Sequence, residues 1–315
     1  MRKWLKGLVL ISAVVCIASP YIDSPSNFTE IELGEKLFFD PILSSNRKIS
    51  CSSCHKPEFA FADTSRISLG VFDRTGERNS PSTMNLKSGV AFFWDGRAST
   101  LEEQAIIPIE NPVEMNLPIK VALMRLTENQ FYREAFQKIY HGKPTARNLG
   151  KALAVFQNSL ETNHSPFDDW KNGENEAAVS TSVKRGFALF NGSANCVKCH
   201  FGSDFSNVEF RNIGLFNGKE LKDSGRAAVT KLRGDLGKFK IGPLRNVALT
   251  APYMHNGMFK SLEEVVDYYD DPDKIIPNSI NRDSLMARPL NLSKKDKQDL
   301  IAFLRSLTDK RFTKN

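Results

Sequence analysis

Two short segments of the chain place apolar residues on one helical face just before a pair of cysteines. Residues 31–39 and 183–190 both show the three- and four-residue spacing that buries one side of a helix. Both contain a glycine followed by leucine and phenylalanine at the same offsets: Gly34, Leu37 and Phe38 in the first, and Gly186, Leu189 and Phe190 in the second. The pattern predicts that one helical unit occurs twice.

Each unit also closes with a predicted helix. Thr145 and Ser293 are residue types that cap helix N-termini, and an apolar stripe follows each of them. The stripes are Leu149, Leu153, Phe156 and Leu160 in the first unit, and Leu300, Ile301, Leu304 and Leu307 in the second. The sequence therefore predicts a mainly α-helical protein with two small helical domains.

Polar segments lie between these helices. Residues 161–181 have Asn172-Gly173 at their centre and are expected to be a loop, so we place the domain boundary there, with domains of residues 20–165 and 166–315. The stretches 62–83 and 202–242 are rich in Gly, Asn, Asp and Ser and lack sustained periodicity. Such composition is typical of long loops that wrap a bound group.

The first residues, 1–19, have the form of a signal peptide. Three basic residues precede an apolar run at 8–17, and two small residues follow it before Pro20. The run is shorter than the roughly 20 residues that span a bilayer, and we expect cleavage and export to the periplasm. Cys16 lies within the run, but valines rather than small residues precede it, which argues against a lipid anchor there.

The net charge of the chain gives little information about its partners. The whole chain carries a formal charge of +7, and loss of the three basic residues in 1–19 leaves +4. This excess is too mild to indicate a nucleic acid partner. It is compatible with an acidic redox partner.

The strongest chemical signal is a repeated motif, Cys51-Ser52-Ser53-Cys54-His55 and Cys196-Val197-Lys198-Cys199-His200. Two thiols one turn apart can form thioethers to the vinyl edge of one porphyrin, while the following histidine lies beneath the iron. The sequence therefore predicts two covalently bound haem c groups, with His55 and His200 as iron ligands. Two cytochrome c-like haem domains with cofactor-wrapping loops are the expected fold.

Other uses of the cysteines fit less well. A zinc site made from two Cys-x-x-Cys pairs needs about 15–20 residues between them, whereas 141 residues separate Cys54 from Cys196. A thioredoxin-like motif does not explain a histidine after both pairs. The fifth cysteine, Cys16, is in the leader, so no cysteine remains for a disulfide framework.

Around these motifs, from about residue 33 to residue 307, the sequence resembles bacterial dihaem cytochrome c peroxidases and the related MauG-type proteins. The resemblance is carried by Leu37-Phe38-Phe39-Asp40-Pro41, Arg78-Asn79-Ser80-Pro81-Ser82, Phe93-Trp94-Asp95-Gly96-Arg97, Asn111-Pro112-Val113-Glu114-Met115, Leu244-Arg245-Asn246-Val247 and Ala251-Pro252-Tyr253-Met254-His255-Asn256-Gly257. It implies that the N-terminal haem meets hydrogen peroxide. The C-terminal haem would receive electrons from a small periplasmic donor, a cytochrome c or a cupredoxin.

The resemblance also implies roles for single residues. Glu114 matches the family's acid/base residue, Gln104 the polar residue that orients peroxide, and Trp94 a tryptophan between the haems. An ordinary core aromatic would explain Trp94 as well.

Asn79, with the backbone oxygens of Thr250 and Pro252, matches a calcium site, and oxygen ligands suit that cation. The family includes dimers, although no apolar stripe in this sequence specifies a homodimer.

The chain departs from many relatives because it has no histidine from 56 to 140. Those relatives close the peroxidatic haem with a histidine from the loop after the first motif. We therefore expect a five-coordinate or water-ligated iron at His55 in the resting oxidised protein.

The far ligand of the second iron is methionine in typical peroxidases of the family and tyrosine in MauG-type proteins. The matching position is Tyr269, whose phenolate would lower the haem potential relative to a thioether. A helix beginning at Ser261 would bury Tyr269 on its apolar face even without a metal. Met258 is the first rival ligand and Met254 the second, both in the preceding loop, and Tyr268 is adjacent.

These observations favour a dihaem cytochrome c peroxidase with an electron path from donor to the haem at His200, Trp94, the haem at His55 and peroxide. A MauG-like enzyme that oxidises residues of a partner protein is the first alternative. A dihaem electron carrier without catalysis is the second. His141 and His164 are expected at the surface, and His255 as structural support near the second haem.

Overall fold

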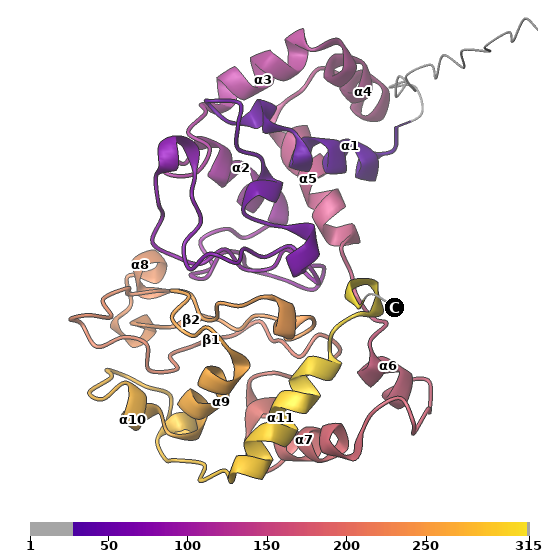
Figure 1. The fold of residues 1–315 in the computed structure, drawn as a ribbon. Helices are drawn as coiled ribbons and strands as arrows, with labels where there is room; N and C mark the ends of the chain where they lie inside the picture. Colours follow the sequence, from indigo (N-terminus) through magenta and orange to yellow (C-terminus); the bar gives the residue numbers. More distant parts are fainter. Residues whose placement is uncertain (1–27, 314–315) are drawn as a thin grey trace, which may run out of the picture.

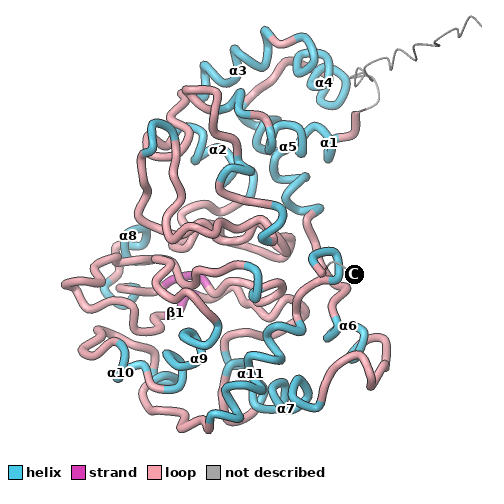
Figure 2. Tube along the Cα trace, in the orientation of Figure 1, coloured by secondary structure: helices cyan, strands magenta, loops and turns pink. Residues whose placement is uncertain are grey.

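The computed structural model describes residues 28–313, so the predicted signal peptide and Cys16 lie outside the described residues. The helices are α1 (Glu30–Phe39), α2 (Leu101–Glu110), α3 (Ile119–Glu128), α4 (Gln130–Tyr140), α5 (Ala146–Ser159), α6 (Pro166–Lys171), α7 (Thr181–Asn191), α8 (Ala227–Thr230), α9 (Leu262–Asp270), α10 (Pro272–Ile275) and α11 (Lys294–Ser306). Strands β1 (Phe210–Arg211) and β2 (Phe239–Lys240) pair antiparallel. The mainly helical fold class is confirmed (Figure 2).

Both halves of the chain pack one helix pair tightly, α1 with α5 and α7 with α11. A Cβ at Gly34 would lie 2.0 Å from the carbonyl oxygen of Ala152, and one at Gly186 would lie 1.9 Å from that of Asp299. Any side chain would push the paired helices apart. The repeated glycine of the sequence therefore marks where the two helices of each unit touch.

The predicted helix starts are also found. The side chains of Thr145, Ser261 and Ser293 each accept a hydrogen bond from the backbone three residues on. All eight residues of the two predicted apolar stripes are buried. Burial of those stripes, more than helix propensity, is what holds such short helices in place.

Two large apolar clusters fall on either side of residues 161–166. One contains buried residues between Leu33 and Leu160, and the other buried residues between Phe167 and Leu307. In Figure 1 the helices α1 to α5 form one half and α6 to α11 the other, with long loops of both halves facing each other between them. The boundary at residue 165 stays a prediction.

The polar segment 161–181 is not entirely loop, as the sequence suggested. It contains α6, which Ser165 caps and which buries Phe167 and Asp168. The Arg245 guanidinium donates to both carboxylate oxygens of Asp168, at 2.9 and 3.0 Å, and this pair is almost fully buried. The helix is thus fixed by its Ser165 cap and by the burial of Phe167, and the ion pair joins it to a segment far along the chain.

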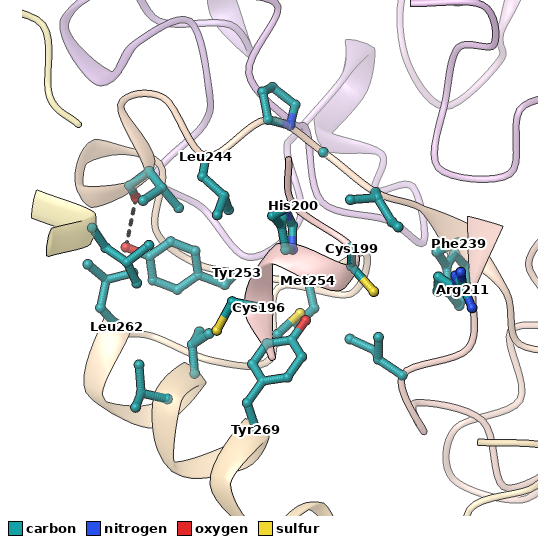
Figure 3. A pocket seen from close by; sticks show the side chains of 18 of the residues that line it. Cys196, Cys199, His200, Arg211, Phe239, Leu244, Tyr253, Met254, Leu262 and Tyr269 are labelled. Atoms are coloured by element: carbon teal, nitrogen blue, oxygen red, sulfur yellow. Dashed lines mark hydrogen bonds between the residues drawn. The ribbon is translucent and has the colours of Figure 1, made fainter. Parts of the chain in front are cut away.

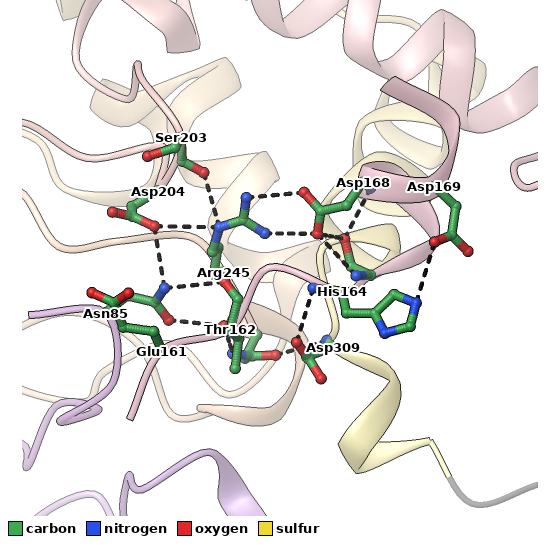
Figure 4. A network of polar contacts seen from close by, with 12 residues as sticks. Asn85, Glu161, Thr162, His164, Asp168, Asp169, Ser203, Asp204, Arg245 and Asp309 are labelled. Carbon is green, nitrogen blue, oxygen red and sulfur yellow. Dashed lines mark hydrogen bonds and ion pairs between the residues drawn. The ribbon is translucent and has the colours of Figure 1, made fainter. Parts of the chain in front are cut away.

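The same arginine joins three segments (Figure 4). Its Nε donates to the carbonyl of Ser203 at 2.9 Å and lies 3.3 Å from the carboxylate of Asp204. Asn85, from the N-terminal half, donates to Asp204 and to the Thr162 carbonyl. The network ties the loop after the second cysteine motif to both halves of the molecule.

No helix within residues 28–313 is long and apolar enough to cross a membrane.

Candidate haem sites

Both cysteine motifs lie on 3-10 turns at the wall of a large cavity. The turn Cys51–Ser53 borders a cavity of about 720 Å³, and the turn Cys196–Lys198 one of about 290 Å³. In both motifs the histidine backbone N–H donates to the carbonyl of the first cysteine, at 3.0 and 2.9 Å. The two cysteines and the histidine of each motif thus face one cavity.

Each motif histidine is held in one tautomer. Nδ1 of His55 lies 3.2 Å from the Phe61 carbonyl and 3.1 Å from that of Pro81, and Nδ1 of His200 lies 3.0 Å from the carbonyl of Phe205. Carbonyls only accept, so Nδ1 carries the proton and the Nε2 lone pair is free. Burial lowers the pKa of both histidines, which favours the neutral ring that binds metals.

These residues fit a haem c group in both cavities. The walls are mainly apolar, the four motif cysteines form no disulfide, and each histidine presents one free ring nitrogen beside them. The backbone carbonyls that fix the histidines are the outer hydrogen bonds expected of iron-bound imidazole.

Glu114 and Gln104 line the cavity of the first motif together with Asn111 and Pro108. Helix α2 carries Gln104, and the turn after it carries Glu114. The Asn111 amide donates to Oε1 of Glu114 at 2.6 Å. Burial, the largest effect, raises the pKa of Glu114, while Asn111 and the charge of Arg97 act in the opposite direction. The structure thus brings the two predicted peroxide-pocket residues together.

The loop that lacks a histidine is packed against the Glu114 turn. The Val71 N–H donates to the Glu114 carbonyl at 2.8 Å, and Arg74 donates to the Pro112 carbonyl at 2.9 Å. A Cβ at Gly70 would lie 2.2 Å from the carbonyl of Val113. Residues 67–76 therefore border the cavity without offering it an imidazole.

Trp94 belongs to the wall that separates the two cavities. It lines both of them, its indole N–H donates to the Asn79 carbonyl at 2.8 Å, and its own carbonyl accepts from the Lys240 N–H at 2.8 Å. One bond holds it to its own half and the other to the opposite half. This is the position that the resemblance assigns to a bridging aromatic residue.

Tyr269 projects from α9 into the second cavity. Figure 3 shows its hydroxyl directed toward the space beside Cys196, Cys199 and His200, with the Met254 sulfur next to it. The Tyr268 hydroxyl instead donates a hydrogen bond to the Ile213 carbonyl at 2.6 Å. The far ligand stays a prediction, with Tyr269 the foremost candidate.

Of the two rival methionines, only Met254 lines this cavity. Met258 lies outside it, packs in a satellite apolar cluster with Tyr268 and Phe259, and has its sulfur 3.7 Å from the Asn256 amide nitrogen. From the sequence Met258 is the first rival, whereas in the structure Met254 is the methionine that faces the cavity.

Asn79, Thr250 and Pro252, the predicted calcium ligands, all line the second cavity near Trp94. The side-chain amide nitrogen of Asn79 donates to the carbonyls of Ser65 and Arg66, so its Oδ1 remains available as a ligand. Residues 28–313 hold no cluster of three or more His, Cys, Asp or Glu side chains suited to a metal. The predicted set uses one amide and two backbone carbonyls, so calcium stays a prediction.

The remaining histidines lie where the sequence suggested. His141 and His164 are exposed, whereas His255 is buried and stacks on Phe239 with ring centroids 3.5 Å apart. Its carbonyl accepts from the Asn79 N–H at 2.7 Å, across the two halves. His255 thus supports the wall near the second cavity.

Sequence reasoning missed Asn111, which holds Glu114, and Lys240, which lines both cavities. The first could have been suspected from its three-residue spacing to Glu114. For Lys240 no sequence signal existed, since the chain is rich in surface lysines.

The comparisons agree with this geometry. Residues 29–176 match the family described as di-haem cytochrome c peroxidase. The chain is 37% identical to the methylamine utilization protein MauG of Methylorubrum extorquens over 90% of this chain and 79% of that protein. It is also 37% identical to the cytochrome c551 peroxidase of Nitrosomonas europaea, over 83% and 80%.

A crystal structure of a MauG-like protein associated with microbial copper homeostasis superposes with a TM-score of 0.82 at 30% identity, over 90% of each chain. The chain therefore belongs to the di-haem cytochrome c peroxidase family, which includes MauG-type proteins. Haem is its cofactor, and by class it is a haem-dependent peroxidase.

Proposed function

We propose that this protein reduces hydrogen peroxide to water with electrons from a small periplasmic redox protein, a cytochrome c or a cupredoxin. Two covalently bound haem c groups, at Cys51, Cys54 and His55 and at Cys196, Cys199 and His200, would supply the redox chemistry. Each turnover consumes one peroxide, two electrons and two protons and gives two waters.

The observation that carries the proposal is the Glu114 carboxyl in the cavity of the first motif, beside Gln104. A carboxylate there accepts a proton from one peroxide oxygen and returns it to the other, which favours heterolytic cleavage. The Asn111 amide donates to one carboxylate oxygen, and the second oxygen would remain available to accept the proton. Gln104 would position the peroxide.

Electrons would enter at the haem of His200 and pass through the wall that Trp94 forms between the cavities. The hydrogen bonds that fix Trp94 from both halves keep its ring in one place, and a fixed ring preserves a constant donor–acceptor distance. We propose calcium at Asn79, Thr250 and Pro252, where it would hold the same wall.

The direct test has two steps. Purified periplasmic protein should contain two haem c groups per chain by pyridine haemochrome assay, and should oxidise reduced cytochrome c when peroxide is added. One haem or none, or no turnover with several cytochromes and cupredoxins, would contradict the proposal.

A second candidate function rests on Tyr269. A phenolate opposite His200, as in MauG-type proteins, would suit an enzyme that oxidises residues of a partner protein rather than one that turns over with a small donor. Fast reaction with peroxide combined with negligible oxidation of reduced donors would favour this candidate. Rapid donor turnover would exclude it.

A further inference from the structure

The wall between the two cavities contains one charged side chain that faces both, Lys240. It lies on β2, whose backbone is bound to Trp94 through the Lys240 N–H. Its ammonium is 5.1 Å from the centroid of Phe92, a residue that lines only the cavity of the first motif. The lysine thus reaches from the C-terminal half into the N-terminal haem cavity.

Lys240 differs from the other cations that line the cavities. Each of the four arginines in the linings has a carboxylate partner: Arg78 with Asp95 and Asp223, Arg97 with Asp95, Arg211 with Asp283, and Arg245 with Asp168. Among residues 28–313, Lys240 has no carboxylate within ion-pair distance and its ammonium makes no hydrogen bond. Burial alone lowers its pKa, to about 8.

Lys240 is half-buried, and a cation that is partly withdrawn from water without a counter-ion is destabilised, so this position favours a bound anion. The anionic groups of a haem are its two propionates, which leave the porphyrin edge opposite the vinyl groups. In the first cavity Cys51 and Cys54 would hold the vinyl edge, and Phe92, Trp94 and Lys240 line the same cavity.

We propose that the Lys240 ammonium binds a propionate carboxylate of the haem held by Cys51, Cys54 and His55. The contact would cross the interface between the halves of the molecule, since the lysine comes from β2 and the haem is held by the N-terminal half. A positive charge at the porphyrin edge stabilises the ferrous haem relative to the ferric haem, so Lys240 raises the reduction potential of the peroxide-reactive haem.

This inference rests on the proposed two-haem function, and the haem count of the wild type tests that function separately. With two haems established, the midpoint potential of each is measured by optical redox titration at pH 7 in wild type, Lys240→Met, Lys240→Arg and Lys238→Met. Lys238→Met is the matched control, because Lys238 pairs with Asp235 and lines neither cavity.

Lys240→Met is expected to lower the reduced-to-oxidised ratio of the haem at His55 about tenfold at fixed potential, or ~59 mV for one electron. Lys240→Arg keeps the charge, and Lys238→Met removes one elsewhere, so both should change this ratio by less than about threefold. The resonance Raman propionate bands of the same haem should shift in both Lys240 variants.

Unchanged potentials and unchanged propionate bands would overturn the proposal. A shift confined to the haem at His200 would overturn the assignment to the first haem. Slower peroxide reaction without a change in potential or bands would mean that Lys240 acts on the substrate instead. If Lys240→Met yields no holoprotein, the bands of Lys240→Arg decide: identical bands to wild type contradict the contact.

Discussion

Glu114→Gln removes the proposed proton carrier and leaves its surroundings almost unchanged. In the wild type the Asn111 amide donates to Glu114 at 2.6 Å, and the glutamine carbonyl oxygen can accept the same hydrogen bond. The side chain also keeps its volume in the cavity. We therefore expect the free energy of unfolding to change by less than about 1 kcal/mol. The effect should appear in the chemistry and not in the fold.

General acid–base catalysis typically contributes 10²- to 10⁴-fold, which is about 3–5 kcal/mol of the barrier. We expect Glu114→Gln to lower kcat/KM for peroxide by a factor in that range. The measurement is the stopped-flow reaction of the purified protein with peroxide. Glu102→Gln, at an exposed residue of α2, the helix that precedes the Glu114 turn, is the matched control and should react like wild type.

The pH profile gives a second readout. Glu114 must be ionised to accept a proton, and burial raises its pKa. The wild-type rate should therefore fall as the pH drops through a value above that of an ordinary glutamate, and this limb should be absent in Glu114→Gln. A rate loss under about fivefold, or an unchanged acid limb, would refute the role of Glu114.

Three further outcomes follow. Tyr269→Phe should change the spin state of the C-terminal haem and raise its potential, followed by EPR and redox titration; a thioether–iron absorption band already present in wild type would contradict a tyrosine ligand. Arg245→Met should lower the free energy of unfolding by about 3–5 kcal/mol in denaturant titration, because it leaves Asp168 buried and unpaired, and a loss under about 1 kcal/mol would argue against it. Gly186→Ala should cost about 1–3 kcal/mol in the same assay, since its Cβ would lie 1.9 Å from the Asp299 carbonyl oxygen, and a stabilised variant would contradict the close helix contact.

The sequence predicted the helices well where one face is apolar and a cap residue precedes it. Thr145 and Ser293 illustrate this, because local spacing and a local hydrogen bond decide the structure there. Helix α6 was missed, although Ser165 and Pro166 are local signals of a helix start, because its six residues are too few to show a helical period and its Asp168–Arg245 contact joins residues far apart in the chain. Contacts of that kind leave no periodic signal.

The residues of the candidate site also separate into those that local sequence patterns predict and those that they do not. The haem attachment residues could be predicted because their chemistry requires a fixed local spacing. The roles of Glu114 and Tyr269 came from family resemblance, and the structure adds which neighbours face the same cavity. The choice of Met254 over Met258 as the rival ligand, and the position of Lys240, depend on loop paths that local patterns do not encode.

The central claim is that the two haem sites differ, with an open, reactive iron at His55 and a closed iron at His200. It is tested most directly by titrating the fully oxidised protein with peroxide under optical and EPR observation. We predict one high-spin and one low-spin ferric haem at rest, and loss of the high-spin signal on addition of peroxide without prior reduction. Two low-spin haems that remain inert to peroxide until one is reduced would contradict the claim.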